Sequence, residues 1–208
     1  VNTDIYHFHD PELIFVAHIL RLKGKKVIYD IHEDLQKQTL SKYYINKSLR
    51  PILANIIWFF EKRLANKTNY NITATDSIKE KFMKINQNTE VVNNYPLDAE
   101  IVFLDINYSS KEKQICYMGG ISQIRGVHNI IKALSYLNDI KLTLAGKISP
   151  SSYEDILKNI KEWENVDFKG FISKSELLNI MIKSKVGVIT FLPEHNHLDA
   201  KTNKMYEY

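Results

Sequence analysis

Apolar and polar positions along the chain change their period repeatedly, from short β-branched and aromatic runs to longer amphipathic segments. Runs of the first kind predict strands, and segments of the second kind predict helices. In the first half the predicted elements are strands over 4–8, 26–30, 71–75 and 90–93, helices over 13–22 and 49–64, and a helix before the last strand that Asp76 or Ser77 caps. In the second half they are strands over 114–118, 141–145, 166–168 and 186–191, and helices over 127–137, 153–163 and 175–182. Such alternation predicts parallel sheets and an α/β fold.

The helix predicted over 49–64 has a wide apolar stripe, which we expect to pack on the sheet. Trp58, Phe59 and Phe60 lie in this helix, next to the basic Lys62 and Arg63. Aromatic residues beside cations are also typical of a helix on a membrane surface. We favour the core interpretation and keep a weak peripheral membrane contact as the alternative.

Between about 96 and 113 the pattern loses its period, and Asp, Asn and Ser residues typical of turns accumulate. We therefore predict a linker over 97–112, between a first domain over 1–96 and a second domain over 113–208. The chain opens directly on a strand, and its last helix is cut well short of the typical ~11 residues. We expect both domains to be incomplete and the chain to be a fragment truncated at both ends.

The composition of the 208 residues, 44% hydrophobic and 25% charged, is that of an ordinary globular chain. The formal net charge of +4 is too small and too evenly spread to indicate nucleic acid binding. The single cysteine, Cys116, cannot form an internal disulfide, so we expect a reducing, cytoplasmic setting. Apolar runs such as 56–60 are far shorter than the ~20 residues that span a bilayer.

A glycine-rich turn follows the strand predicted over 114–118. Gly119 and Gly120 come directly after this strand, and Arg125 and Gly126 precede the next helix. Glycines let a backbone approach an anion, and an arginine can grip a phosphate with two hydrogen bonds. The turn therefore predicts a phosphate site. A turn whose glycines only relieve backbone strain, with Arg125 in solvent, explains the same residues equally well.

A second polar stretch, 199–208, follows the strand predicted to end near Phe191. Ligands of parallel sheets bind beyond the carboxyl ends of the strands, so this stretch and the glycine turn share one sheet edge. Glu207 can accept hydrogen bonds from the vicinal hydroxyls of a ribose, and Lys204 can neutralise phosphate charge. Spacing alone favours a simpler interpretation, a solvated, lysine-rich start of a helix.

A third group of polar residues follows the first two strands; it comprises His7, His9, Asp10, Asp30, His32, Glu33 and Asp34. These residue types are competent ligands for zinc or manganese. His7 and His9 project from the same face of a strand, where they can simply pack. We therefore favour hydrogen bonding to a polyol, with His32 as donor or acceptor, and expect no metal.

Four runs in the chain, over 6–13, 27–34, 117–126 and 203–208, together resemble retaining GT-B glycosyltransferases of the nucleotide-sugar-dependent group, the glycosyl transferases group 1. The runs occur in the expected order over nearly the whole chain. The resemblance implies two Rossmann-like domains, each with a mostly parallel sheet flanked by helices. In that family the second domain binds the nucleotide diphosphate, and the first binds the acceptor.

The resemblance implies transfer of a hexose from a nucleotide diphosphate sugar to a glycan or lipid-linked acceptor, with retention of the anomeric configuration. Cell-surface polysaccharide synthesis is the implied process, in the cytoplasm or at the inner face of the membrane. No cofactor, metal or nucleic acid is expected. The alternatives are a sugar-nucleotide epimerase of the same fold and a non-catalytic module that binds nucleotide sugars.

The resemblance assigns the donor to residues of the second domain: Gly119, Gly120, Arg125, Asp199, Asn203, Lys204 and Glu207. Many members carry Arg at the position of Gly120 and Lys at that of Arg125, so the phosphate contact here depends on Arg125 and Lys204. Glu207 matches the glutamate expected to hold the ribose, and Asp199 is shorter than the usual Glu. On the acceptor side the matched residues are His9, Asp10, His32 and Glu33, and the catalytic group comprises His32, Arg125 and Lys204.

Overall fold

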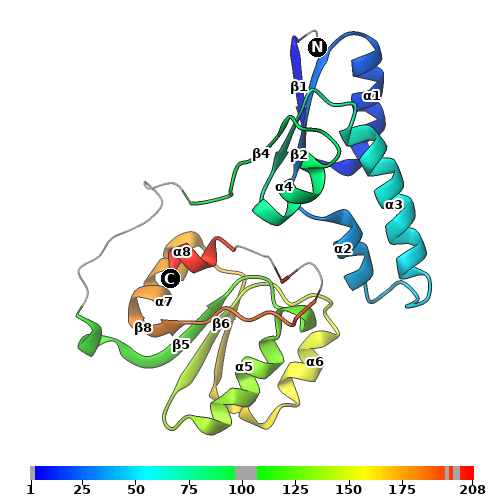
Figure 1. Ribbon diagram of the computed structural model, residues 1–208. Coiled ribbons are helices and arrows are strands. Elements are labelled where there is room, and N and C mark those ends of the chain that lie inside the picture. Colours follow the sequence, from blue (N-terminus) through cyan, green and yellow to red (C-terminus); the bar gives the residue numbers. More distant parts are fainter. Residues whose placement is uncertain (1–2, 97–106, 195–196, 199–201) are drawn as a thin grey trace. The chain divides into compact units, whose positions relative to one another are not determined.

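The computed structural model describes residues 3–96, 107–194, 197–198 and 202–208, which form two compact units (Figure 1). Unit 1 comprises the described residues among 1–95 and 193–201, and unit 2 comprises those among 96–192 and 202–208. Most of the predicted linker over 97–112 lies outside the described residues. Each unit has its own sheet and its own core.

Unit 1 contains a four-stranded, all-parallel sheet in the order β1-β2-β3-β4. Its strands are β1 (Ile5–Phe8), β2 (Lys26–Ile31), β3 (Tyr70–Thr73) and β4 (Thr89–Val91). Its helices are α1 (Ile14–Leu22), α2 (Leu35–Ser41), α3 (Arg50–Ala65) and α4 (Asp76–Met83), with a 3-10 turn, η1 (Pro11–Leu13), before α1. The predicted α/β fold is confirmed for this half of the chain.

The core of unit 1 lies on one face of this sheet, which we call the inner face. Val27, Tyr29 and Ile31 of β2 are at most 1% exposed, whereas the intervening Asp30 lies on the opposite, outer face. Phe8 of β1 stacks on Tyr29, with ring centroids 4.7 Å apart. The helices α1, α3 and α4 add Ile14, Ala17, Ala65, Ile78 and Phe82 to the same cluster. The outer face is therefore left to polar side chains where β1 and β2 end.

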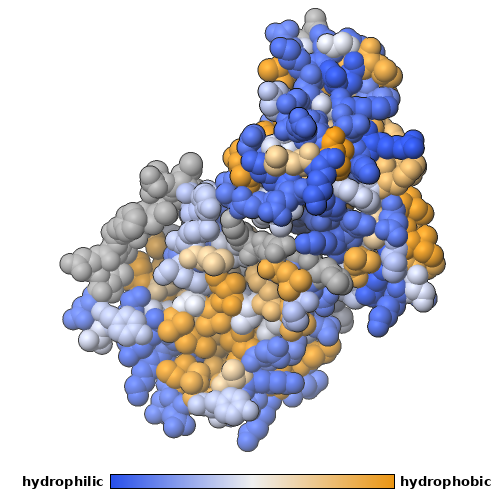
Figure 2. Space-filling model, viewed as in Figure 1, coloured by the Kyte–Doolittle hydropathy of each residue, from blue (hydrophilic) through white to orange (hydrophobic). Residues whose placement is uncertain are grey.

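The prediction that the apolar stripe of α3 packs on the sheet is wrong. The helix packs through the small side chains of Ala54 and Ala65, which are at most 1% exposed. Most of the large apolar residues of the predicted stripe are exposed, whereas Leu64 packs against the core cluster. The exposed ones are Leu49, Ile52, Leu53, Ile56 and Phe60, and Figure 2 shows apolar surface along this helix. Trp58 alone of the three aromatic residues turns inward, with its ring edge-on to Phe82. Helical period indicates a stripe but not which side faces the core.

Two local features of unit 1 differ from the sequence prediction. The helix α2 occupies a segment predicted to be a polar loop, and Asp34 caps it by accepting hydrogen bonds of 3.1 Å from the amides of Gln36 and Lys37. The cap of α4 is Thr75, whose hydroxyl accepts from the Ile78 amide, rather than Asp76 or Ser77. Neighbouring Thr, Asp and Ser residues are all good caps, so backbone geometry decides among them.

Unit 2 contains a second four-stranded, all-parallel sheet, in the order β7-β6-β5-β8. Its strands are β5 (Glu112–Met118), β6 (Lys141–Ala145), β7 (Val166–Gly170) and β8 (Ser184–Gly187). Its helices are α5 (Val127–Ala133), α6 (Tyr153–Lys158), α7 (Lys174–Lys183) and α8 (Lys204–Glu207). Its 3-10 turns are η3 (Tyr108–Ser110), η4 (Gln123–Arg125), η5 (Leu134–Tyr136) and η6 (Lys161–Asn165). The helices predicted over 127–137 and 153–163 thus end early; η5 follows α5 directly, and two residues separate η6 from the end of α6.

Helices cover both faces of the unit 2 sheet (Figure 1). On one face, α5 and α6 pack with Tyr117, Leu142 and Leu144 into the larger core cluster. On the other face, Cys116 and Met118 contact residues of α7. Alternate residues of β5 are therefore buried on opposite sides, as expected for a parallel strand between two helical layers.

No helix within the described residues is both long enough and apolar enough to span a bilayer.

Candidate functional site

The glycine turn leaves the carboxyl end of β5 at the centre of the unit 2 sheet. Gly119 has φ +143° and Gly126 has φ +67°, backbone conformations that residues with a side chain rarely adopt. The Tyr117 hydroxyl donates a 2.8 Å hydrogen bond to the Gly120 carbonyl. Burial raises the pKa of Tyr117 even though the positive charge of Arg125 lowers it. The buried side chain of Tyr117 therefore ties the turn to the core of unit 2.

Arg125 folds back over the two glycines. Its Nη1 atom lies 3.6 Å from the point where a Cβ of residue 119 would stand, and its Nε atom lies 3.7 Å from the corresponding point at Gly120. The guanidinium also lies 5.6 Å from the centre of the Phe191 ring. The backbone carbonyl of Arg125 accepts a 2.8 Å hydrogen bond from the Thr190 hydroxyl. No described carboxylate forms an ion pair with this guanidinium. Arg125 therefore retains its charge for an anion at the turn.

The short helix α8 returns to the same strand end. The backbone amide of Met118, the last residue of β5, donates a 2.9 Å hydrogen bond to the Tyr208 hydroxyl. The Tyr208 ring fills the space that a Cβ of residue 187 would occupy at the end of β8. Burial raises the pKa of Tyr208 above its ordinary value. The glycine turn and α8 are thus both anchored at the carboxyl edge of the unit 2 sheet, as the sequence predicts.

The donor residues proposed from the sequence are placed unequally. Lys204 and Glu207 lie one turn apart on α8 and form an ion pair with each other. Asn203 caps α8 through its backbone, since its carbonyl accepts from the Tyr206 and Glu207 amides. Asp199 lies outside the described residues. A ligand that contacts Lys204 or Glu207 would therefore compete with the ion pair between these two side chains.

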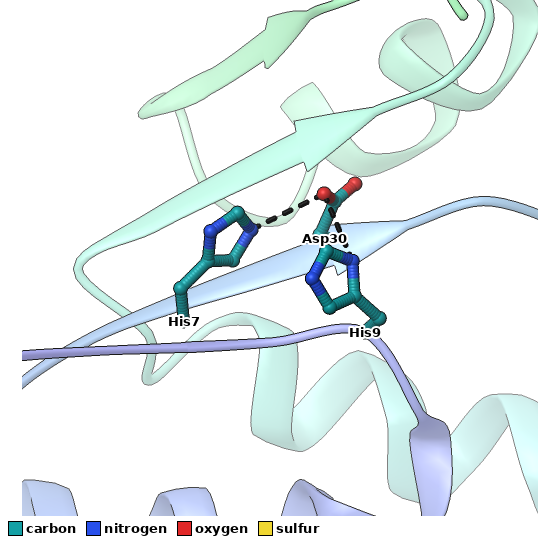
Figure 3. A group of neighbouring side chains, drawn as sticks. All are labelled: His7, His9 and Asp30. Carbon is teal, nitrogen blue, oxygen red and sulfur yellow. Dashed lines mark hydrogen bonds and ion pairs between the residues drawn. The ribbon is translucent and has the colours of Figure 1, made fainter.

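A cluster of three histidines around one carboxylate forms the second polar site, in unit 1. Figure 3 shows two of these histidines, His7 and His9, with Asp30. The Asp30 Oδ2 atom lies 3.2 Å from His7 Nε2 and 3.2 Å from His9 Nδ1. His32 Nε2 lies 3.0 Å from His9 Nδ1 and 3.6 Å from Asp30 Oδ1. The side chain of Asp30 is 15% exposed, whereas those of the histidines are 41–54% exposed. We call these four residues the histidine cluster.

The structure brings together two of the four predicted acceptor residues, His9 and His32, in this cluster. Asp10 and Glu33 are exposed and lie outside it, and Glu33 accepts a hydrogen bond from the Gln38 amide group. The central position belongs to Asp30, which the sequence placed in the polar group without a role. Its alternation with His32 along β2, like that of His7 with His9 along β1, was the signal available.

A further titratable pair lies inside unit 1, where sequence patterns did not indicate one. The Tyr29 hydroxyl donates a 3.0 Å hydrogen bond to Glu61 Oε1, and Glu61 is only 3% exposed. Burial raises the pKa of Glu61 to about 7, against the lowering effects of Tyr29 and Lys81. Lys81 itself contacts the Asp34 carboxylate at 2.7 Å and lies 3.9 Å from the centre of the Trp58 ring. The pair belongs to the core, away from the two sheet-edge sites.

Residues 100–196 match the family described as Glycosyl transferases group 1. The matched segment contains the glycine turn and the strands β5 to β8, ends before α8, and spans somewhat less than half of the chain. A comparison with curated proteins finds no match.

Solved structures of similar fold include Anabaena Alr3699/HepE in complex with UDP-glucose, with 15% identity and a TM-score of 0.61 over 92% of this chain and 54% of that one. A variant of S. aureus TarM bound to fondaparinux, α-GlcNAc-glycerol and UDP gives 15% identity and a TM-score of 0.64 over 93% and 38% of the two chains. A putative UDP-N-acetylglucosamine 2-epimerase from Listeria monocytogenes gives 13% identity and a TM-score of 0.51, over 89% of this chain and 51% of that one. The chain thus spans about half or less of these proteins.

Likeness at such low identity establishes the fold. The protein is therefore an α/β protein with two Rossmann-like domains of the GT-B type, and its second domain carries the match to the glycosyl transferases group 1.

Proposed function

We propose that the protein is a glycosyltransferase that moves a hexose from a nucleotide diphosphate sugar to a glycan or lipid-linked acceptor, with retention of the anomeric configuration. The observation that carries the proposal is the family match over 100–196, because it includes the glycine turn and Arg125 at the carboxyl edge of the sheet. Ligands of open parallel sheets bind at that edge. Cell-surface polysaccharide synthesis is the process that the family resemblance implies.

The proposed chemistry of unit 2 is the handling of negative charge. Departure of the nucleotide diphosphate leaves charge on its oxygens, which Arg125 and Lys204 stabilise in the transition state. Loss of one such donor typically raises the barrier by roughly 3 kcal/mol. Glu207 holds the ribose hydroxyls, and Asn203 and the glycine pair complete the donor site. In this scheme two cations supply the positive charge at the diphosphate, so the donor step needs no metal and no cofactor.

Unit 1 receives the acceptor in this proposal. His9 and His32 present exposed imidazoles that can exchange hydrogen bonds with a polyol, and Asp10 and Glu33 lie nearby in sequence. In a front-face reaction the leaving phosphate takes the proton of the acceptor hydroxyl, so no strong protein base is required. His32 then positions the acceptor hydroxyl rather than removing its proton.

We place the reaction in the cytoplasm, with a weak peripheral contact at the inner face of the membrane. The exposed side of α3 supports the contact: Phe59 and Phe60 are 49% and 48% exposed, and the Arg63 guanidinium lies 4.2 Å from the centre of the Phe59 ring. Exposed aromatic and basic residues together are typical of helices that lie on anionic lipid. Cosedimentation of the full chain with anionic and neutral vesicles measures this contact.

The donor site is tested by calorimetry of UDP and other nucleoside diphosphates with the full chain. We expect Arg125→Ala and Glu207→Ala each to weaken nucleotide binding, because each removes a direct contact. Lys132→Ala is the matched control, since it removes an exposed cation of α5 away from the turn. Unchanged affinity in both site variants would disprove the donor assignment.

The reaction type is tested by following free nucleotide with a panel of sugar nucleotides, with and without glycan or lipid-linked acceptors. A transferase releases the nucleoside diphosphate in step with glycosylation of the acceptor, and the product keeps the anomeric configuration of the donor. An epimerase converts the sugar nucleotide without acceptor, a result that the fold shared with the Listeria protein makes worth testing. Binding without turnover would identify a non-catalytic module and refute the proposal.

A further inference from the structure

The four side chains of the histidine cluster are placed by two neighbouring strands. His7 and His9 alternate on β1 and just beyond it, and Asp30 and His32 alternate on the neighbouring β2 and just beyond it. Since β1 and β2 are parallel and in register, both pairs project from the outer face of the sheet. Figure 3 shows His7, His9 and Asp30 pointing toward one another. The inner face behind them is the stacked Phe8–Tyr29 core. Two rigid strands thus hold three imidazoles and one carboxylate together.

The spacing of the polar atoms matches that of a tetrahedral metal site. The ligand atoms of His7, His9 and Asp30 all lie within 4.8 Å of one another. His7 and His9 each lie 3.2 Å from Asp30 Oδ2, and His32 lies 3.0 Å from His9 Nδ1 and 3.6 Å from the other carboxylate oxygen, Asp30 Oδ1. Bonds of about 2.0–2.1 Å to a tetrahedral Zn²⁺ place neighbouring ligand atoms about 3.3 Å apart. Three ligands are therefore already in place, and rotation of the His32 ring and of the Asp30 carboxylate would add the fourth.

Hydrogen bonding alone accounts poorly for His9. Its Nδ1 atom lies 3.2 Å from the Asp30 carboxylate and 3.0 Å from His32 Nε2. A ring nitrogen either donates or accepts, so one atom cannot serve both neighbours with linear hydrogen bonds. A cation between the four atoms would satisfy all of them at once, because each would point a lone pair at the same centre.

We propose that His7, His9, Asp30 and His32 bind a Zn²⁺ ion. Three imidazole nitrogens and one carboxylate oxygen suit zinc, whereas magnesium and calcium prefer shells made of oxygen. The exposed histidines leave the site open to ions from solvent. The geometry thus leads us to depart from the sequence-based expectation that this region holds no metal. The donor chemistry of unit 2 does not depend on this ion.

Zinc at the cluster has a consequence for transfer that rests on the proposed function. The ion would bind His9 Nδ1 and His32 Nε2, so neither atom could accept a hydrogen bond from an acceptor hydroxyl, and each ring would keep only the N–H of its other nitrogen as a donor. We expect Zn²⁺ to inhibit transfer at the acceptor side and a chelator to restore it, with nucleotide binding unchanged. Zinc binding and transfer are measured separately, so failure of one does not imply failure of the other.

The direct test is calorimetry of ZnCl₂ with the chelator-treated full chain, together with visible spectroscopy of CoCl₂ additions. We expect one tight Zn²⁺ per chain, a Co²⁺ spectrum with the strong absorption of tetrahedral coordination, and a higher melting temperature with zinc. His7→Gln, His32→Gln and Asp30→Asn should each weaken binding at least roughly tenfold. His128→Gln is the matched control, because its imidazole contacts Tyr153 in unit 2.

Two results would overturn the proposal. The first is an octahedral Co²⁺ spectrum, or none, in the wild-type chain. The second is equal Zn²⁺ affinity in the wild type, the three cluster variants and His128→Gln, which would identify adventitious surface binding. Circular dichroism of each variant without metal shows that it is folded, so a loss of affinity reports the ligand that was removed.

Discussion

The two units each have a four-stranded parallel sheet, but the faces of the two sheets are covered differently. In unit 2, helices cover both faces, so alternate residues of β5 are buried on opposite sides and the proposed donor residues lie beyond the strand end. In unit 1, the described helices that join the core cluster pack on the inner face, and the outer face carries the histidine cluster. A strand therefore presents chemistry through its side chains only where one of its faces is free of packing.

The two cores also differ in polarity. Among the described residues, the buried polar side chains of unit 1 are Thr39, Glu61, Thr68, Asn71, Thr73 and Thr89, and those of unit 2 are Thr143 and Ser184. Asn71 connects β3 to the end of α3 by donating to the Ala65 carbonyl and accepting from the Thr68 hydroxyl. Each such group must keep its partner, because an unpaired buried polar atom costs about 1–3 kcal/mol. Polar pairing therefore contributes more to the core of unit 1 than to that of unit 2.

The largest expected effect tests the use of the sheet faces. Leu144→Ala on β6 removes a side chain with no exposure and should destabilise unit 2 by about 2–5 kcal/mol. His7→Ala on β1 removes an outer-face side chain and should change the stability of unit 1 by about 0.5 kcal/mol or less in chelator. Urea unfolding followed by circular dichroism measures both. Equal losses would mean that the outer face of unit 1 is packed as tightly as the core of unit 2.

The next effect tests the polar core of unit 1. Because burial raises the pKa of Glu61 from 4.5 to about 7, the folded protein holds a proton that the unfolded chain has released over this range. Stability should therefore fall as the pH rises from 4.5 to 7, by up to about 3 kcal/mol, and then level off. Glu61→Gln keeps an acceptor for Tyr29 and has no charge to bury. This variant should lose the pH dependence and be the more stable chain at pH 8.

Denaturant midpoints at pH 5 and pH 8, measured for the wild type and for Glu61→Gln, show whether Glu61 causes the pH dependence of stability. A wild-type chain whose stability does not fall across this range, or falls equally in the variant, would show that Glu61 is ionised at no cost in the core.

The smallest effect concerns the glycine turn of unit 2. Gly119→Ala places a side chain at φ +143° and should cost about 1–3 kcal/mol. Gly120→Ala is the matched control, because its φ lies outside the strained range and its new Cβ would meet Arg125 Nε at an ordinary 3.7 Å. Thermal unfolding ranks the two variants. A less stable Gly120→Ala chain would mean that contact with Arg125, rather than backbone strain, sets the requirement for glycine.

Much of the fold could be predicted from the sequence because strands and helices have different hydrophobic periods. Ten of the predicted elements agree with the observed ones to within two residues at each end; they are β1 to β7, α1, α3 and α7. The clearest is the strand over 141–145, which matches β6 residue for residue. The predictions failed where the hydrophobic period does not determine which side of a helix is buried or whether a short segment is helical. The stripe of α3 indicated a helix correctly but the wrong buried side, and α2 was missed because Leu35–Ser41 is short and polar.

For the candidate sites, the sequence indicated which groups come after which strands. It placed the glycine turn, α8 and the histidines at the carboxyl ends of parallel strands, since strand order along the chain is enough for that inference. It did not reveal that Tyr208 anchors α8 to Met118, that Lys204 pairs with Glu207, or that Asp30 is the centre of the histidine cluster. The contact of Tyr208 with Met118 and the approach of Asp30 to His7 join residues far apart along the chain. Lys204 and Glu207 have the i,i+3 spacing of a helical pair, so their contact follows once α8 is known to be a helix.

By itself, the sequence determined the α/β alternation, the residues that punctuate it and the strand ends that bear chemistry, because these depend on local period and turn preference. Only the tertiary structure decided which side of α3 is buried, how Arg125 lies over Gly119 and Gly120, and how closely His7, His9, Asp30 and His32 approach. Such distances depend on strand register and on packing against the rest of the chain, which no local pattern encodes.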